Sequence, residues 1–143
     1  MLDYDSIVQM AKKDIELDDS KLDFESARNP TLQEKYLNFY TDCSLMVNKC
    51  EMEYNVLRKK RWEYYSGKCA DEVYQEFPLP VKVLKGDINM YLDADQEIID
   101  LKLKVQYYTK LQNYLDKILK IISNRQWDIR NIIEYRKFLS GIV

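Results

Sequence analysis

The chain has 143 residues, with 22 Lys and Arg against 24 Asp and Glu, 46% hydrophobic residues and no histidine. This composition supports one folded domain, and it excludes catalysis by Ser-His-Asp or Cys-His groups. No apolar run approaches the roughly 20 residues of a membrane span, and the first residues lack the order of a signal peptide, so we expect an intracellular protein.

The N-terminal part of the chain predicts short helices before a long one. We expect a helix over residues 5–13, an acidic turn over 14–20 and a short helix over 21–28. Asn29 can cap a new helix with Pro30 at its first position, where the missing N–H of proline costs nothing.

The long helix is predicted over 30–65, because no glycine or proline follows Pro30 until Gly67. Its apolar stripe repeats at intervals of four and three residues and consists of Tyr36, Tyr40, Cys43, Val47, Cys50, Tyr54, Leu57, Arg61 and Tyr64. We interpret the two cysteines on this stripe as small buried hydrophobic residues. A helix of this length needs a partner along its side, so it is expected to form one arm of a helical hairpin or bundle.

Residues 66–86 predict a loop and connector. Pro78 and Pro80 interrupt any helix over 66–80, and residues 81–84 alternate like a strand that has no partner. Acidic residues follow over 93–100 and offer helix N-caps. They lack the central glycine and terminal glutamate of a calcium loop, so we expect no metal or other cofactor there.

The C-terminal part, 94–139, contains neither glycine nor proline and predicts helix. Its first apolar stripe consists of Leu101, Val105, Tyr108, Leu115, Leu119 and Ile122. A second stripe is rotated relative to the first, and the predicted bend or turn lies at 123–125. The apolar residues that follow exceed what one small bundle can cover, which predicts self-association; burial inside the protomer is the alternative. The predicted oligomerisation residues are Ile129, Ile132, Ile133, Phe138 and Leu139.

The expected fold class is therefore all-α, a long helical hairpin or bundle that assembles into a homo-oligomer. Residues 1–143 are expected to form a single all-helical domain. In that domain 1–65 carries the N-terminal helices and a basic cluster, 66–86 is the connector, and 87–143 is the C-terminal helical segment with the oligomerisation residues.

The basic cluster is the sharpest functional feature of the sequence. Four consecutive cations at 58–61 lie next to aromatic residues, and cations along a phosphate backbone with aromatic faces for bases are what single-strand binding requires. The alternative is structural, because cations are favoured in the last turns of any helix. The candidate DNA-binding residues are Arg58, Lys59, Lys60, Arg61, Trp62, Tyr65 and Lys68.

Other functional classes find little support in the residues. The three glycines are too scattered for a phosphate-binding loop, and the three cysteines have no zinc-site spacing, so we expect a protein that is not an enzyme. Nine further cations over 101–143 are typical of a solvated helix face, or they extend the DNA-binding surface. The main alternative function is a helical scaffold that binds only protein partners through its basic cluster.

Several stretches resemble, in order and spacing, the UvsY recombination mediator family of T-even-type bacteriophages. They are Lys12-Lys13-Asp14 with the acidic turn, 20–27, the segment 58–67 that ends in Tyr-Tyr-Ser-Gly, and 123–125 with 136–138. The resemblance runs nearly end to end. This chain differs by adding Arg58 and Lys60 and by placing Trp62 where the family often has an aliphatic residue.

The resemblance implies a non-enzymatic mediator in the cytoplasm of an infected bacterial host, acting in recombination, repair and recombination-dependent replication. Its implied partners are single-stranded DNA, a phage RecA-like recombinase and the phage single-strand DNA-binding protein. The implied assembly is a hexamer or heptamer, formed mainly through the C-terminal region. The family's Lys-x-Arg pair, implicated in DNA binding, falls on Lys59 and Arg61.

Overall fold

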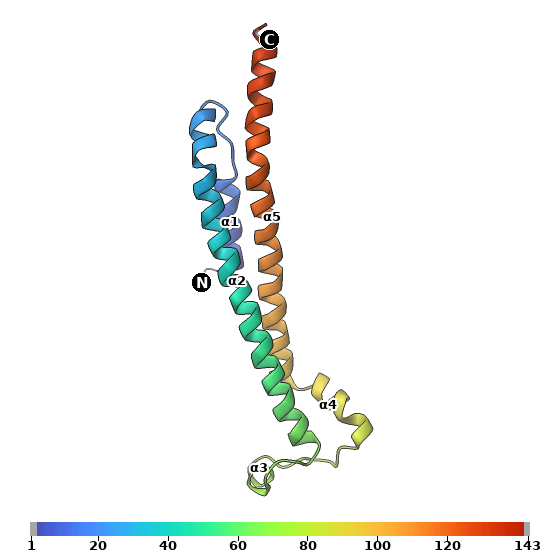
Figure 1. The fold of residues 1–143 in the computed structure, drawn as a ribbon. Helices are drawn as coiled ribbons and strands as arrows, with labels where there is room; N and C mark the ends of the chain where they lie inside the picture. Colours follow the sequence, from blue (N-terminus) through green and yellow to red (C-terminus); the bar gives the residue numbers. More distant parts are fainter. Residues whose placement is uncertain (1–2, 142–143) are drawn as a thin grey trace. The chain divides into compact units, whose positions relative to one another are not determined.

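The computed structural model describes residues 3–141, all of whose regular elements are helical. The elements in chain order are α1 (Tyr4–Asp14), α2 (Leu22–Tyr65), α3 (Asp71–Glu76), η1 (Lys85–Asp87), α4 (Ile88–Asp93) and α5 (Gln96–Leu139) (Figure 1). The predicted all-α class is confirmed. Across these residues, no helix combines the length and the apolar character needed to cross a membrane.

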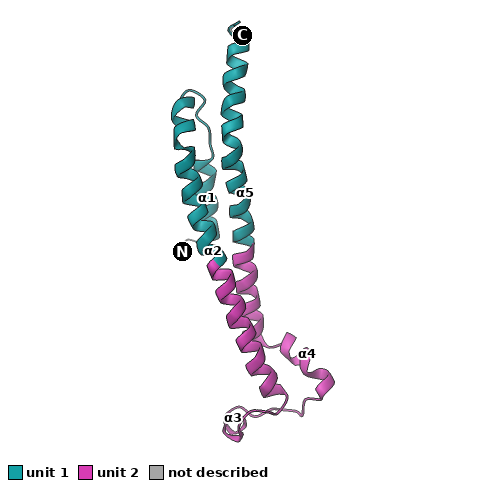
Figure 2. Cartoon of the chain, in the orientation of Figure 1, with its two compact units in different colours: residues 1–44, 110–143 teal, residues 45–109 magenta. Residues whose placement is uncertain are grey.

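The chain divides into two compact units (Figure 2). Unit 1 comprises Met1–Ser44 and Lys110–Val143, and unit 2 comprises Leu45–Thr109. Each unit contains one segment of α2 and one antiparallel segment of α5 (Figure 2). Unit 1 adds α1, whereas unit 2 adds α3, η1 and α4. The expectation of a single domain stays a prediction.

The core of unit 1 is a seam between its three helical segments. The buried positions on α5 recur at intervals of four and three residues, and Arg125 occupies one of them. The buried hydrophobic residues of this unit are Ile7, Ala11, Leu32, Tyr36, Cys43, Leu111, Leu115, Ile118, Ile122 and Ile129.

Unit 2 is a helical hairpin closed at one end by α4. Ile88 and Leu92 of α4 and Ile98 of α5 are buried together. The residues that pack against them are Tyr54, Leu57, Tyr65 and Val83. Val47 and Cys50 of α2 are also buried, so the stripe predicted along α2 is the buried face of that helix.

The start of α1 lies one residue before its predicted position, and the end of α2 lies where it was predicted. Asp3 caps α1 by accepting a hydrogen bond from the backbone N–H of Ser6 at 2.8 Å. At the end of α2, Gly67 has φ +78°, and the N–H of Lys68 donates to the carbonyl of Glu63 at 2.9 Å. This is the arrangement in which glycine closes a helix, because its backbone reaches the left-handed region without strain.

The predicted helix start at Pro30 is wrong. The helix α2 begins at Leu22 and continues through Pro30, so the separate helix over 21–28 does not exist. Asn29 does not cap either, because its side-chain amide donates to the carbonyl of Ile122 on α5 at 2.8 Å. Contacts across the unit therefore hold the segment helical on both sides of the proline.

Two other predicted boundaries also differ. The helix α5 is continuous through 123–125, where a bend was predicted, and Arg125 is a buried member of the seam rather than a break in it. The change of face read from the sequence arose because a charged residue occupies a core position. The predicted loop over 66–80 contains the six-residue helix α3.

Candidate nucleic-acid interface

The basic cluster Arg58 to Arg61 lies on α2 in unit 2, just before the last turn of the helix. That last turn contains no basic residue. The favourable interaction of cations with a helix C-terminus falls off within the last turn, so the helix dipole does not account for this cluster.

Three cations of the cluster face solvent or lie at the surface. The side chain of Lys59 is 80% exposed and makes only a loose pair with Glu63, at 3.8 Å. Lys60 is exposed and Arg58 half-buried, and neither side chain has a hydrogen-bond or ion-pair partner among residues 3–141. These three side chains carry positive charge that the protein itself offsets little.

Arg61 differs from its neighbours because two carboxylates bind it. Its Nη2 donates to Glu97, and its Nε lies 3.6 Å from Oδ2 of Asp95. The same carboxylate of Asp95 accepts a hydrogen bond of 2.7 Å from the hydroxyl of Tyr65. Asp95 also caps α5, because its Oδ1 accepts from the backbone N–H groups of Glu97 and Ile98. Arg61 and Tyr65 thus join the end of α2 to the start of α5.

The electrostatics of this junction follow from burial and pairing. Burial tends to lower the pKa of Arg61, but the hydrogen bond to Glu97 and the charge of Asp95 outweigh it and raise that pKa. Burial and the hydrogen bond to Asp95 raise the pKa of Tyr65 to about 12. Arg61 is therefore a charged group whose field is largely offset within the protein.

The two remaining candidates form a pair of their own. The ammonium group of Lys68 lies 4.4 Å from the centroid of the Trp62 ring, and Trp62 as a residue is 37% exposed. A cation over an aromatic face is a favourable contact, and it occupies one face of the indole. The rest of the Trp62 side chain is partly open to solvent.

Sequence reasoning missed the contacts that fix the segment after α2. The ring of Tyr74, on α3, stacks on that of Tyr64 with centroids 5.6 Å apart, and its hydroxyl donates to the Tyr64 carbonyl at 2.8 Å. The hydroxyl of Tyr64 in turn donates to the carbonyl of Phe77 at 3.0 Å. The only sequence signal was a tyrosine within a stretch that otherwise predicts a loop.

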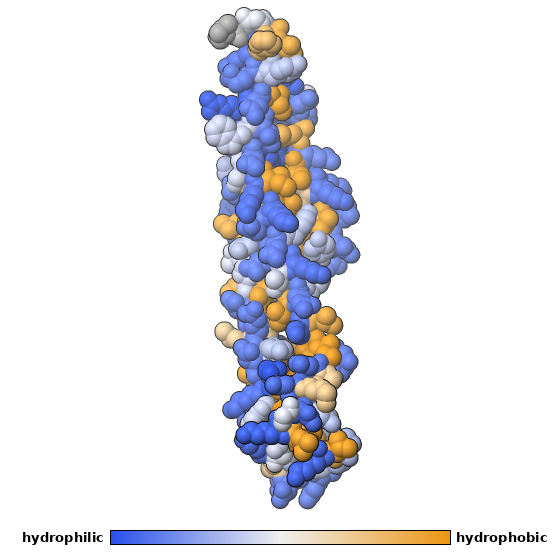
Figure 3. All heavy atoms as spheres, turned by 90° about the vertical axis from the view of Figure 1, so that its right-hand side faces the viewer, coloured by the Kyte–Doolittle hydropathy of each residue, from blue (hydrophilic) through white to orange (hydrophobic). Residues whose placement is uncertain are grey.

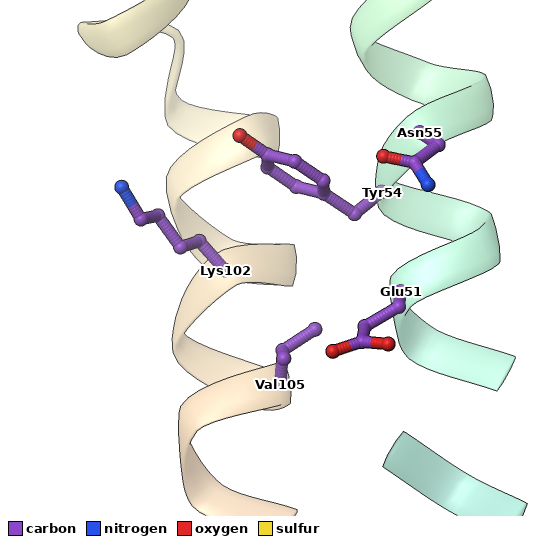
Figure 4. A pocket seen from close by; sticks show the side chains of 5 residues that line it. All are labelled: Glu51, Tyr54, Asn55, Lys102 and Val105. Carbon is purple, nitrogen blue, oxygen red and sulfur yellow. The ribbon is translucent and has the colours of Figure 1, made fainter. Parts of the chain in front are cut away.

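An opening lies between α2 and α5 in unit 2 (Figure 4). It measures about 310 Å³ and is lined by Glu51, Tyr54, Asn55, Lys102 and Val105. Figure 4 shows the ring of Tyr54 reaching from α2 toward α5, with Glu51 and Lys102 on either side. In the described part of the chain, no cluster of carboxylates and cysteines could hold a metal ion.

The predicted oligomerisation residues differ in exposure. Ile129 is 3% exposed and belongs to the core of unit 1, and Ile132 is half-buried. Ile133, Phe138 and Leu139 are exposed, the last two at 77% and 65%. Hydrophobic side chains remain visible up to the C-terminal end of α5 in Figure 3. Their role in assembly stays a prediction.

Comparison with known proteins gives a consistent result. Residues 10–142 match the model of the family described as "Recombination, repair and ssDNA binding protein UvsY". The recombination protein uvsY of Enterobacteria phage T4 is 29% identical over 130 residues, which cover 91% of this chain and 92% of that protein. A crystal structure of the bacteriophage T4 recombination mediator protein UvsY, lattice type II, aligns with a TM-score of 0.86 and 25% identity over 99% of this chain and 100% of that one. The crystal structure of the same protein in lattice type I aligns with a TM-score of 0.83 and 28% identity, over 93% of this chain and 98% of that one.

Proposed function

The chain belongs to the UvsY family of recombination, repair and single-stranded-DNA-binding proteins, and on this premise we propose that it is a recombination mediator that binds single-stranded DNA. The single observation that supports DNA binding most is the group of weakly offset cations Arg58, Lys59 and Lys60, with Lys68 and Trp62 beside them. Phosphates bind such cations without regard to sequence.

The proposed mechanism is a shift of binding equilibria rather than a chemical step. The mediator binds the strand, weakens the hold of the single-strand DNA-binding protein, and favours loading of a RecA-like recombinase in the cytoplasm of the infected host. A homo-oligomer, hexameric or heptameric by the family resemblance, multiplies weak contacts from each protomer through their effective concentration. This explains how a chain of net charge −2 could hold DNA.

The contacts of Arg61 indicate which cations of the cluster are available to DNA phosphates. Because Asp95 and Glu97 already bind Arg61, we assign the phosphate contacts mainly to Arg58, Lys59, Lys60 and Lys68. Arg61 and Tyr65 then act by holding the end of α2 against α5, although both were candidates for direct contact.

DNA binding is tested by fluorescence anisotropy with single-stranded and double-stranded oligonucleotides at several salt concentrations. We expect the wild type to prefer single strands, with an affinity that falls steeply as salt rises. The variant Lys59→Ala/Lys60→Ala should bind more weakly and with a shallower salt slope. The matched variant Lys110→Ala/Lys117→Ala removes the same charge from exposed positions on α5 and should bind like the wild type.

The outcomes separate the competing functions. Absence of DNA binding at low salt would overturn the mediator proposal and favour the scaffold that binds only proteins. Equal losses of DNA affinity in the two double variants would show that the cations of the cluster contribute no more to DNA binding than cations elsewhere on the chain. Mediation itself is read from the DNA-dependent ATPase activity of the recombinase on strands covered by the single-strand DNA-binding protein.

Self-association is tested by light scattering. Phe138→Asp/Leu139→Asp should reduce the mass of the assembly if the exposed end of α5 forms the interface. Leu45→Asp is the control, because Leu45 is exposed to a similar extent, 63%, and lies elsewhere on the chain. An unchanged mass in the Phe138/Leu139 variant would exclude that end of α5 as the interface.

A further inference from the structure

An open cavity lies beside the basic cluster in unit 2, between the last turns of α2 and the segment that carries α3. Its volume is about 340 Å³, at the lower end of the roughly 300–1,000 Å³ typical of small-ligand sites. The residues that line it are Leu57, Lys60, Arg61, Glu63, Tyr64, Cys69, Val73 and Phe77.

The walls of the cavity are held in place. The stacked rings of Tyr64 and Tyr74 and the two tyrosine hydroxyl bonds already described fix α3 and the residue that follows it against α2. The N–H of Cys69 also donates to the hydroxyl of Tyr74, at 3.2 Å. The cavity is therefore formed without a ligand, which lowers the ordering cost of binding.

The chemistry of the lining is apolar with a cation at its edge. Phe77 is 61% exposed and Val73 37% exposed, so apolar surface faces water at a concave place. Lys60 lines the same cavity and makes no ion pair with another of residues 3–141. Glu63 brings a negative charge to the same lining, and its Oε1 lies 3.8 Å from Nζ of Lys59.

We propose that this cavity takes one nucleobase of a bound single strand, with the adjoining phosphates on Lys60 and the cations next to it. This inference rests on the proposed function. A flat apolar group attached to a polyanion fits an apolar wall with a cation at its edge, because a base can contact Phe77 while its phosphate meets the ammonium group of Lys60.

The occupied cavity would also give the protein its preference for single strands. Phosphate contacts alone do not favour a single strand, because a duplex has the higher backbone charge density. The bases of a duplex are stacked and paired, whereas a base in a single strand can be splayed out at little cost. Base insertion therefore favours the single strand without reading its sequence.

The test compares an ordinary single-stranded oligonucleotide with an abasic one of equal length and charge. The wild type should bind the abasic strand about tenfold more weakly, the scale of one base-aromatic contact. Its salt slope should be the same for both strands, because the phosphate contacts are unchanged. Phe77→Ala should lower the affinity for the ordinary strand. It should therefore reduce the ratio of the affinity for the ordinary strand to the affinity for the abasic strand.

Matched variants keep this test specific. Phe24→Ala removes an equally exposed phenylalanine, 60%, from unit 1 and should leave the ratio at the wild-type value. Val73→Trp fills the cavity and should narrow the ratio as Phe77→Ala does, which guards against a folding defect in either variant. Circular dichroism checks the helix content of each protein.

Each outcome bears on a different claim. A ratio unchanged by both Phe77→Ala and Val73→Trp would overturn the base site and leave DNA binding intact. Loss of recombinase binding in these variants, with DNA binding unchanged, would show that a protein side chain occupies the cavity and would also overturn it. A wild type that binds neither strand contradicts the proposed function itself.

Discussion

Glu25 on α2 and Arg125 on α5, 100 residues apart in the chain, form an ion pair that is almost completely buried in unit 1. Nη1 of Arg125 also donates to the carbonyl of Asp14 at the end of α1, at 3.1 Å, and Nε of Arg28 donates to Glu25 at 3.0 Å. Nη2 of Arg28 donates to the same Asp14 carbonyl at 2.9 Å. These contacts join all three helical segments of the unit at one point.

Removal of this pair is expected to destabilise the protein strongly. Arg125→Met leaves the buried carboxylate of Glu25 with Arg28 alone and removes one of the two donors to the Asp14 carbonyl, so the free energy of unfolding should fall by about 3 kcal/mol. Urea unfolding followed by circular dichroism measures it. Lys120→Ala, which breaks an exposed pair with Asp116 on the same helix, should change it by less than about 0.5 kcal/mol. Similar small losses in both variants would contradict the role of the buried pair.

Pro30 is expected to weaken α2. Proline in a helix interior leaves the carbonyl four residues earlier, here that of Ser26, without its N–H partner. Replacement by Ala restores that hydrogen bond but loosens the unfolded chain, so Pro30→Ala should raise the free energy of unfolding by about 1–2 kcal/mol. The neighbouring exposed substitution Thr31→Ala measures the gain from helix propensity alone. A Pro30→Ala protein no more stable than Thr31→Ala would refute the expectation.

Two cations of the basic cluster should differ in their effect on stability. Arg61→Ala leaves the largely buried carboxylate of Asp95 without its cation, and we expect a loss of about 1–3 kcal/mol. Lys59→Ala removes only an exposed pair and should cost less than about 0.5 kcal/mol. Thermal and urea unfolding of the two variants make the comparison. Equal stability would mean that the junction of α2 and α5 does not depend on Arg61.

Stability at acid pH should depend on Asp14. Burial tends to raise the pKa of this carboxyl, but the hydrogen bonds from Lys35 at 2.7 Å and Tyr36 at 2.6 Å outweigh it and hold the pKa below 3.8. An unfolded aspartate binds its proton near pH 3.9, so the stabilisation is complete above that pH and is lost as pH falls through the lowered folded value.

The measurement is urea unfolding between pH 6 and pH 2.5. Asp14→Asn should be less stable than the wild type at the upper end, and the difference should shrink toward the lower end. Asp42→Asn, at an exposed position of α2, serves as the control. A constant difference between Asp14→Asn and the wild type across this range would be inconsistent with the assigned pairing.

Several features of the fold were readable from local patterns. The four-and-three spacing from Tyr36 to Tyr64 identified the buried face of α2, because side chains at those intervals lie on one side of a helix. Gly67 marked the end of α2 because it adopts a positive φ readily. The burial of Cys43 and Cys50 followed from the same periodicity.

The errors came from residues whose role depends on a distant partner. Pro30 and Asn29 have the local character of a helix start, yet contacts with α5 across unit 1 hold the helix through them. Arg125 has the local character of a break in the seam, and only the carboxylate of Glu25 makes it a core residue. Arg61 belongs by sequence to a basic run, and its carboxylate partners come from the start of α5.

The amino-acid sequence by itself determined the all-helical class, the apolar faces of the long helices and where positive charge concentrates, because these properties arise from neighbours a few residues apart. Only the tertiary structure decided which charges are offset and which remain available to a ligand. The physical reason is that a charge can be buried only where an opposite charge or a hydrogen-bonding group meets it, and the fold brings such groups together from distant parts of the chain.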